Sequence, residues 1–222
     1  MELGEVMRTT FAARDYTGEP LPDAILFDIL DMARFAPSGG NRQGVRVIVV
    51  RADLLRGRLA GLARPAAARY TAQAAAGEVP WNPLAATGVA PAEIAATEPR
   101  PSLVEPFMTA SVVLVFALDL GAVAATDQDL DRIGIIAGAS VYPLVWNVLL
   151  AAREAGFGGT ISTMAVAMEP AVRDLLGVPA DHAISALVPL GKPRRQLRRL
   201  RRRAVAAFAT RERFDGEPFA RA

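Results

Sequence analysis

The sequence predicts a single domain in which helices and strands alternate, and three observations support this fold class. The chain has 222 residues, enough for one domain to bury most of its apolar surface. Hydrophobic residues make up 52% of it and cysteine is absent, as in a globular chain without a disulfide framework. Segments with helical spacing alternate with short apolar runs. Periodicity alone therefore favours an α/β fold with a parallel sheet.

The first half of the chain begins with a short helix and an extended arm, which together cover residues 1–20. Three regular elements are then predicted: a helix over 21–35, a strand over 45–51, and a helix over 53–77 that is broken by Pro65. Residues 78–106 are rich in proline, alanine and threonine. We expect them to form an irregular loop or lid, because a loop of this length is usually functional or mobile.

The second half continues the alternation of helix and strand. The predicted elements are a strand over 110–118, a helix over 127–155, a strand over 158–164, a helix over 169–176 and a strand over 183–190.

One stretch of this half, Ile133 to Ala152, carries no charge over twenty residues, which is long enough to span a bilayer. Glycines, Pro143 and Asn147 dilute its hydrophobicity, and charged residues crowd its ends. We therefore interpret it as a helix buried in the core or in a subunit interface.

The loop between the first helix and the first strand, Ala36 to Gln43, combines a proline, two glycines, a hydroxyl and two amides. Pro37 ends the helix, and Gly39 and Gly40 leave the backbone unhindered by side chains. Such a loop offers backbone N–H groups and polar side chains to a flat, polar-edged ligand or a phosphate. Taken alone, the loop is better interpreted as an ordinary helix-to-strand connection.

The side chains needed for most protein-borne catalysis are scarce. His182 is the only histidine, so a zinc site or a Ser-His-Asp triad is a poor interpretation, and this residue reads as part of a solvent-facing loop. The cluster Asp127-Gln128-Asp129-Leu130-Asp131 reads as a helix-capping face. A chain without good nucleophiles or acids suits a cofactor that carries the chemistry itself.

Seven arginines between Arg194 and Arg203, with Lys192 before them, concentrate positive charge near the C-terminus, although the net charge of the chain is only +2. Three interpretations are open: a solvated segment, a nucleic-acid patch, or a phosphate site. No nucleic-acid-binding motif and no interleaved aromatic residue accompany the run. We therefore expect no nucleic-acid partner and, because the uncharged run 133–152 is interpreted as a buried helix, no membrane.

Four ordered segments together resemble the FMN-dependent nitroreductase family. They are the arm Met7–Tyr16 with the turn Glu19-Pro20-Leu21-Pro22, the loop Ala36–Gln43, the segment Gly138–Asn147, and the pair Ala155–Thr160 and Leu190–Pro193. The resemblance covers nearly the whole chain. It implies an α+β fold with a central mixed sheet flanked by helices, in one domain over residues 1–222. It also implies an intertwined homodimer in which the C-terminal arm, residues 192–222, reaches over the partner subunit.

The resemblance also implies which residues hold FMN. Arg14 would lie near the N1–C2=O edge of the flavin or its ribityl chain, where a cation stabilises the reduced ring. The polar loop would approach from the partner subunit, the strand segment would present main-chain groups to the ring, and C-terminal arginines would bind the phosphate. The residues concerned are Pro37, Ser38, Gly39, Asn41 and Gln43 of the loop, Ile161, Ser162 and Thr163 of the strand, and Arg201 and Arg202.

Phe11 departs from the family pattern, because it stands where a basic phosphate ligand is common. One hypothesis is that the phosphate contact has moved to other arginines, with Arg8 or the C-terminal run as substitutes. The alternative is that Phe11 is a core residue whose replacement by a charge would be unfavourable.

The function implied is that of a cytoplasmic FMN-dependent oxidoreductase, which uses NADH or NADPH to reduce a nitroaromatic, a quinone or an activated alkene by ping-pong hydride transfer. The first six residues show no secretory signal, which supports the expected compartment. Two alternatives stay open on the same fold. One is a specialised flavin enzyme, either dehalogenase-like or flavin-fragmenting, and the other is a flavin-binding protein without turnover.

Overall fold

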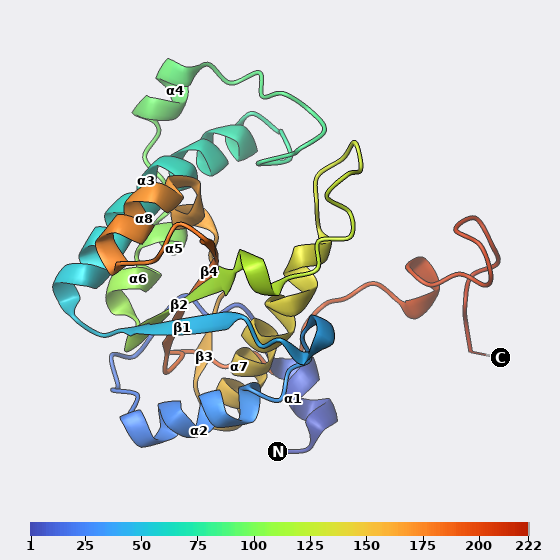
Figure 1. Ribbon diagram of the computed structural model, residues 1–222, viewed down its shortest axis with the longest axis horizontal. Coiled ribbons are helices and arrows are strands. Elements are labelled where there is room, and N and C mark those ends of the chain that lie inside the picture. Colours follow the sequence, from blue (N-terminus) through green and yellow to red (C-terminus); the bar gives the residue numbers. More distant parts are fainter. Residues whose placement is uncertain (222) are drawn as a thin grey trace.

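The computed structural model describes residues 1–221 and shows a compact body from which the C-terminal segment extends (Figure 1). The helices are α1 (Leu3–Thr9), α2 (Asp23–Ala33), α3 (Asp53–Ala75), α4 (Pro91–Ala96), α5 (Pro101–Val104), α6 (Pro106–Thr109), α7 (Tyr142–Glu154) and α8 (Glu169–Leu176). The strands are β1 (Val45–Val50), β2 (Val112–Asp119), β3 (Gly158–Gly159) and β4 (His182–Gly191). Short 3₁₀ segments are η1 (Gly39–Asn41), η2 (Leu120–Ala122), η3 (Ile136–Ser140), η4 (Met164–Met168) and η5 (Val205–Ala207).

The strands form one sheet in the order β1-β2-β4-β3, and every neighbouring pair within residues 1–221 is antiparallel. The fold is α+β, as the resemblance implied. The parallel sheet favoured by periodicity and the mixed sheet implied by the resemblance are both wrong for the described chain. Alternation of helix and strand does not fix strand direction, because a connection of a dozen or more residues can return the chain in either sense.

Two layers of helices enclose the sheet, and β2 is buried on both faces. One face packs against α2 and α7 through residues such as Ile29, Leu114 and Val148. The other face packs against α3, α6 and α8 through residues such as Leu59, Val115 and Val172. The near-continuous apolar sequence of β2 follows from this double burial.

Two helix predictions need correction, and proline explains both. Pro65 lies inside α3 without ending it, because packing of the helix against the sheet and η4 outweighs the one lost backbone hydrogen bond. The helix predicted over 127–155 starts only at Tyr142. Pro143 occupies its first turn, where its missing N–H costs nothing, and the preceding residues form turns and η3.

The uncharged run from Ile133 is therefore divided between a loop, η3 and α7. Among the described residues, no helix has both the length and the apolar character that a membrane span requires. On α7, Val145, Val148 and Leu149 are buried in the core, whereas Trp146 is 41% exposed.

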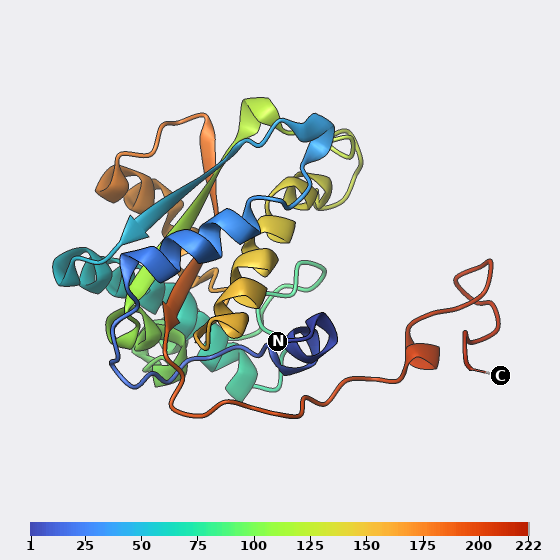
Figure 2. The same cartoon turned by 90° about the horizontal axis from the view of Figure 1, so that it is seen from below.

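Two more segments differ in part from expectation. Residues 78–106 include α4 and α5 as well as irregular chain, and α4 lies at the periphery above α3 (Figure 1). The strand predicted over 158–164 is regular only at Gly158–Gly159 and continues as a single bridge between Ser162 and Leu187. Gln196 still contacts the body at the Thr9 carbonyl, and the C-terminal segment beyond it extends away from the body, as Figure 2 shows from a second direction.

Candidate functional site

The N-terminal arm is fastened along the end of the sheet where β3 meets β4. The Ala13 N–H donates to the Gly159 carbonyl at 2.9 Å, and the Thr17 N–H donates to the Lys192 carbonyl at 2.9 Å. The hydroxyl of Tyr16 contacts the carbonyl of Pro189 at 2.9 Å and that of Ala13 at 2.8 Å. Burial raises the pKa of Tyr16 well above its usual range, so the phenol stays protonated and can donate.

Two glycines of β3 allow neighbouring segments to approach closely, Gly158 the arm and Gly159 the strand β4. A Cβ atom on Gly158 would lie 3.3 Å from the Cβ of Ala13, and one on Gly159 would lie 2.6 Å from the carbonyl oxygen of Pro189. The Gly158-Gly159 pair is therefore a consequence of close backbone approach.

A proline interrupts the ladder beside the arm. Ser162 and Leu187 exchange both backbone hydrogen bonds, at 2.8 and 2.9 Å, and Gly158 pairs with Gly191. The position between them would pair Thr160 with Pro189, which has no N–H to donate. The strand predicted over 158–164 breaks for this reason; the ladder resumes only as the single Ser162–Leu187 bridge, and residues 160–163 border a pocket.

That pocket has a volume of about 110 Å³ and unites several predicted residues. Arg14, Ile161, Ser162 and Thr163 all line it. The rest of the lining was not predicted from the sequence and consists of Tyr70 from α3, Ser102 and Leu103 from α5, Pro106 and Phe107 from α6, Thr160, Met164 and Pro189. Nothing in the sequence marked Tyr70, because only the packing of α3 against η4 brings it there.

The pocket is electrostatically one-sided, since Arg14 is the one charged residue among the described residues that line it, and no carboxylate is among them. Arg14 forms no ion pair with any residue from 1 to 221, and its one hydrogen bond, to the Ala12 carbonyl, is long at 3.4 Å. A cation without a protein counter-charge favours an anionic or electron-rich group of a ligand.

The polar loop of residues 37–43 lies outside this pocket and is held by its own hydrogen bonds. Ser38 Oγ accepts from the Gln43 N–H at 3.0 Å, and the Gln43 side chain donates to Asn41 Oδ1 at 3.2 Å. The Gly39 N–H donates to Ser140 Oγ at 3.1 Å. Asn41 and Gln43 both have positive φ angles, 54° and 51°, so the loop turns sharply and stays exposed.

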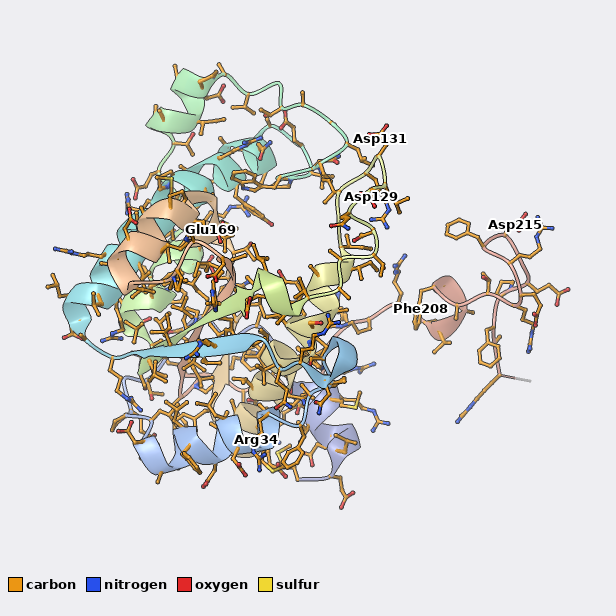
Figure 3. The ribbon with its side chains drawn as sticks, in the orientation of Figure 1. Arg34, Asp129, Asp131, Glu169, Phe208 and Asp215 are labelled. Carbon is orange, nitrogen blue, oxygen red and sulfur yellow. The ribbon has the colours of Figure 1, made fainter. Side chains whose placement is uncertain are left out.

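The arginines predicted to bind phosphate also lie apart from the pocket. Arg201 and Arg202 are exposed on the extended C-terminal segment, and Arg202 donates to the Arg201 carbonyl at 2.8 Å. Figure 3 shows Phe208 farther along the same segment, away from the body. Within a single chain, the structure thus brings together only the arm and the strand segment of the predicted site.

Phe11 has a packing role. It lies partly buried against the cluster of Ala13, Tyr16 and Ala110 and does not line the pocket. The structure therefore favours the interpretation of Phe11 as a core residue of the arm.

These features of fold and site agree with the comparisons to known proteins. The model of the Nitroreductase family matches residues 7–192, and the chain belongs to that family, whose members are FMN-dependent oxidoreductases. No curated protein sequence matches the chain.

Among solved structures, an NADPH:FMN oxidoreductase from Vibrio harveyi complexed with NAD+ has a TM-score of 0.66 at 19% identity, covering 96% of this chain and 78% of that one. NfrA2 of B. megaterium has a TM-score of 0.67 at 19% identity, covering 97% and 76%. Iodotyrosine deiodinase bound to FMN and 3-iodo-L-tyrosine has a TM-score of 0.65 at 20% identity, covering 91% and 96%. At these identities the likeness concerns the fold.

Proposed function

We propose that this protein is an FMN-dependent oxidoreductase that uses NADH or NADPH to reduce a small-molecule acceptor, such as a nitroaromatic, a quinone or an activated alkene, in a ping-pong cycle. The observation that carries the proposal is the pocket in which the unpaired Arg14 faces the interrupted strand at residues 160–163, with no carboxylate present. The V. harveyi structure, an NADPH:FMN oxidoreductase of the same fold, supports the choice of cofactor and reductant.

The residues present fit a flavin in their chemistry. FMN supplies the hydride chemistry that the side chains of this protein lack. Arg14 would stabilise negative charge at the polar edge of the ring, and the backbone of Ile161 and Thr163, on either side of the paired Ser162, would hydrogen-bond to that edge. Within residues 1–221, Ile161 makes no backbone hydrogen bond, so its N–H and carbonyl are available to a ligand.

The remaining predicted groups would come from a second subunit of a homodimer. Pro37, Ser38, Gly39, Asn41 and Gln43 stand on a loop that borders no part of the Arg14 pocket in its own chain. Arg201 and Arg202 stand on a segment that extends beyond the body. We infer that these groups complete the site of the partner, with the two guanidinium groups on the FMN phosphate.

Titration of the purified protein with FMN tests the proposal. Replacing both Arg201 and Arg202 by alanine should weaken FMN binding at least tenfold, since a charge-assisted hydrogen bond contributes about 1.5–3 kcal/mol. Arg194→Ala is the matched control, because that guanidinium already pairs with Asp15 at 3.1 Å. Equal effects of the two changes, or no effect, would show that the arginine run is only a solvated surface.

Turnover is tested separately from binding. The flavin-loaded protein should be reduced by NADH or NADPH under anaerobic conditions and reoxidised by an added quinone or nitroaromatic compound. A protein that binds FMN but is not reduced would be a flavin-binding protein without turnover. Reoxidation by a halogenated phenol with release of halide would instead favour a dehalogenase-like activity, which the fold shares with iodotyrosine deiodinase.

A further inference from the structure

A second, more apolar pocket adjoins the one that contains Arg14. It has a volume of about 350 Å³, at the lower end of the range for small-molecule sites. The two pockets share Tyr70, Thr163 and Met164. The remaining lining consists of Ala66 from α3, Pro80, Trp81, and Val166 and Ala167 from η4. A volume of this size suits a compound of one or two rings.

Trp81 is held against this pocket by several independent contacts. Its N–H donates to Oε1 of Gln73 at 3.1 Å, and its indole Nε1 donates to the Ala66 carbonyl at 3.4 Å. Gln73 itself is 3% exposed, so its amide is fixed. The guanidinium of Arg69 lies over the indole, 4.1 Å from the ring centroid.

The backbone at Trp81 is also unusual, with a φ of 55°. A large residue rarely adopts this conformation, and a strained residue persists only where its surroundings impose it. Glu78 contributes to that restraint, since its carboxylate accepts hydrogen bonds from Thr87 Oγ1 and the Gly88 N–H, both at 2.7 Å. The loop is thus closed on itself while the indole stays 40% exposed at the pocket.

Tyr70 stands at the junction of the two pockets. Its hydroxyl makes no hydrogen bond with any residue in the described part of the chain, although the ring is half-buried. A phenol placed so can donate to an oxygen of a ligand that reaches from one pocket into the other.

From these contacts we propose that Trp81 and Tyr70 form the acceptor subsite, and that it takes planar aromatic acceptors of one or two rings with a hydrogen-bond-accepting oxygen, such as quinones. The indole provides a fixed stacking surface, and the Tyr70 hydroxyl binds the oxygen. This inference rests on the proposed function, because it places the acceptor beside the pocket assigned to the flavin.

Binding of 1,4-naphthoquinone, measured by equilibrium dialysis with both the flavin-loaded and the flavin-free protein, tests the subsite. Trp81→Leu should weaken binding at least tenfold, because it removes the stacking surface. Tyr70→Phe should weaken it about three- to tenfold, as expected for the loss of one hydrogen bond. Leu84→Ala is the matched control on the same loop, since Leu84 is 94% exposed and lines neither pocket. Circular dichroism confirms that each variant is folded.

These measurements distinguish an error in the proposed acceptor subsite from an error in the proposed oxidoreductase function. If naphthoquinone binds Trp81→Leu as tightly as it binds the wild type, the subsite proposal is wrong. This holds even if the protein binds FMN and is reduced. If no FMN binds but quinone binding is lost only in the Trp81 and Tyr70 variants, the subsite stands and the proposed oxidoreductase function falls. With flavin present, Trp81→Leu should slow reoxidation by the quinone, whereas Leu84→Ala should leave the rate of reoxidation unchanged.

Discussion

At the scale of single residues, Asp127 shows how one buried carboxylate organises a loop. It is 4% exposed, and its Oδ2 accepts from the Ile135 N–H at 2.8 Å, from the Ile136 N–H at 3.3 Å and from Arg132 at 2.8 Å. The Ile135 N–H is the main cause that holds the pKa of Asp127 below its usual value, and Arg132 adds to it. The residue therefore closes the loop between β2 and η3.

The stability of the protein should consequently depend on Asp127 in a defined pH range. Because the folded pKa is lowered, the stabilisation is present above the unfolded pKa of about 3.9 and is lost as pH falls through the folded value. Asp127→Asn should thus lower the melting temperature at pH 7, and the difference from wild type should shrink below about pH 4. Thermal melts between pH 3 and pH 7 measure this.

Asp129→Asn is the control, since Asp129 lies exposed on the same loop, as Figure 3 shows. Its melting temperature should follow that of the wild type throughout. A difference between Asp127→Asn and wild type that stays constant down to pH 3 would contradict the assignment.

At the scale of elements, β3 is short for two reasons. A side chain at Gly159 would clash with the Pro189 carbonyl, and Pro189 has no N–H to donate to Thr160. Gly159→Ala should destabilise the protein by about 1–3 kcal/mol, the usual cost of overpacking, because the new Cβ would meet the Pro189 carbonyl. Gly61→Ala, inside α3 with open space around its Cβ position, should instead stabilise by about 0.5–1 kcal/mol. Urea unfolding of both variants measures the contrast. Equal effects would refute the account of β3.

The elements also show what the sequence could predict. Apolar periodicity located α2, α3, α8 and the three longer strands, because each buries a regular face or is buried on both. It overestimated the helix over 127–155, since an uncharged run gives no signal of where a helix starts apart from Pro143. It also missed the break in the strand at Thr160, since that break depends on Pro189, which is nearly thirty residues away in sequence.

The same limit applies to the candidate site. The family resemblance predicted Arg14 and residues 161–163, and the structure brings these into one pocket. No motif in the sequence identified Tyr70 or Trp81 as site residues, because their positions depend on how α3 and the following loop pack on η4. The loop of residues 37–43 and the two arginines stay predictions, since a single chain does not place them at the pocket.

At the scale of the whole molecule, the surface indicates a second copy of the chain. Large apolar side chains are exposed on and beside α2 and on α7, among them Phe27 at 69%, Phe35 at 71% and Trp146 at 41%. Apolar surface of this kind usually marks an interface. The resemblance likewise implied a homodimer, with the uncharged run in its interface.

Trp146→Arg should therefore disrupt the dimer while leaving the core intact, giving a monomer or an aggregate by light scattering. Leu144→Arg is a poorer test, because Leu144 also packs against the core. Leu54→Arg is the control, since Leu54 is 70% exposed and belongs to α3 rather than to α2 or α7. The wild type should have a mass near twice 23.5 kDa. A soluble wild-type monomer would overturn the dimer.

The docking of the N-terminal arm has a consequence for synthesis of the protein. Residues 11–17 leave the ribosome about 140 to 180 residues before their partners, Gly159, Pro189 and Lys192. The arm therefore stays unpaired while the intervening residues are translated. Contacts between residues so distant in sequence also form slowly. The pocket beside Arg14 is thus completed only when β4 is in place, so a nascent chain cannot hold a ligand there until its body is nearly finished.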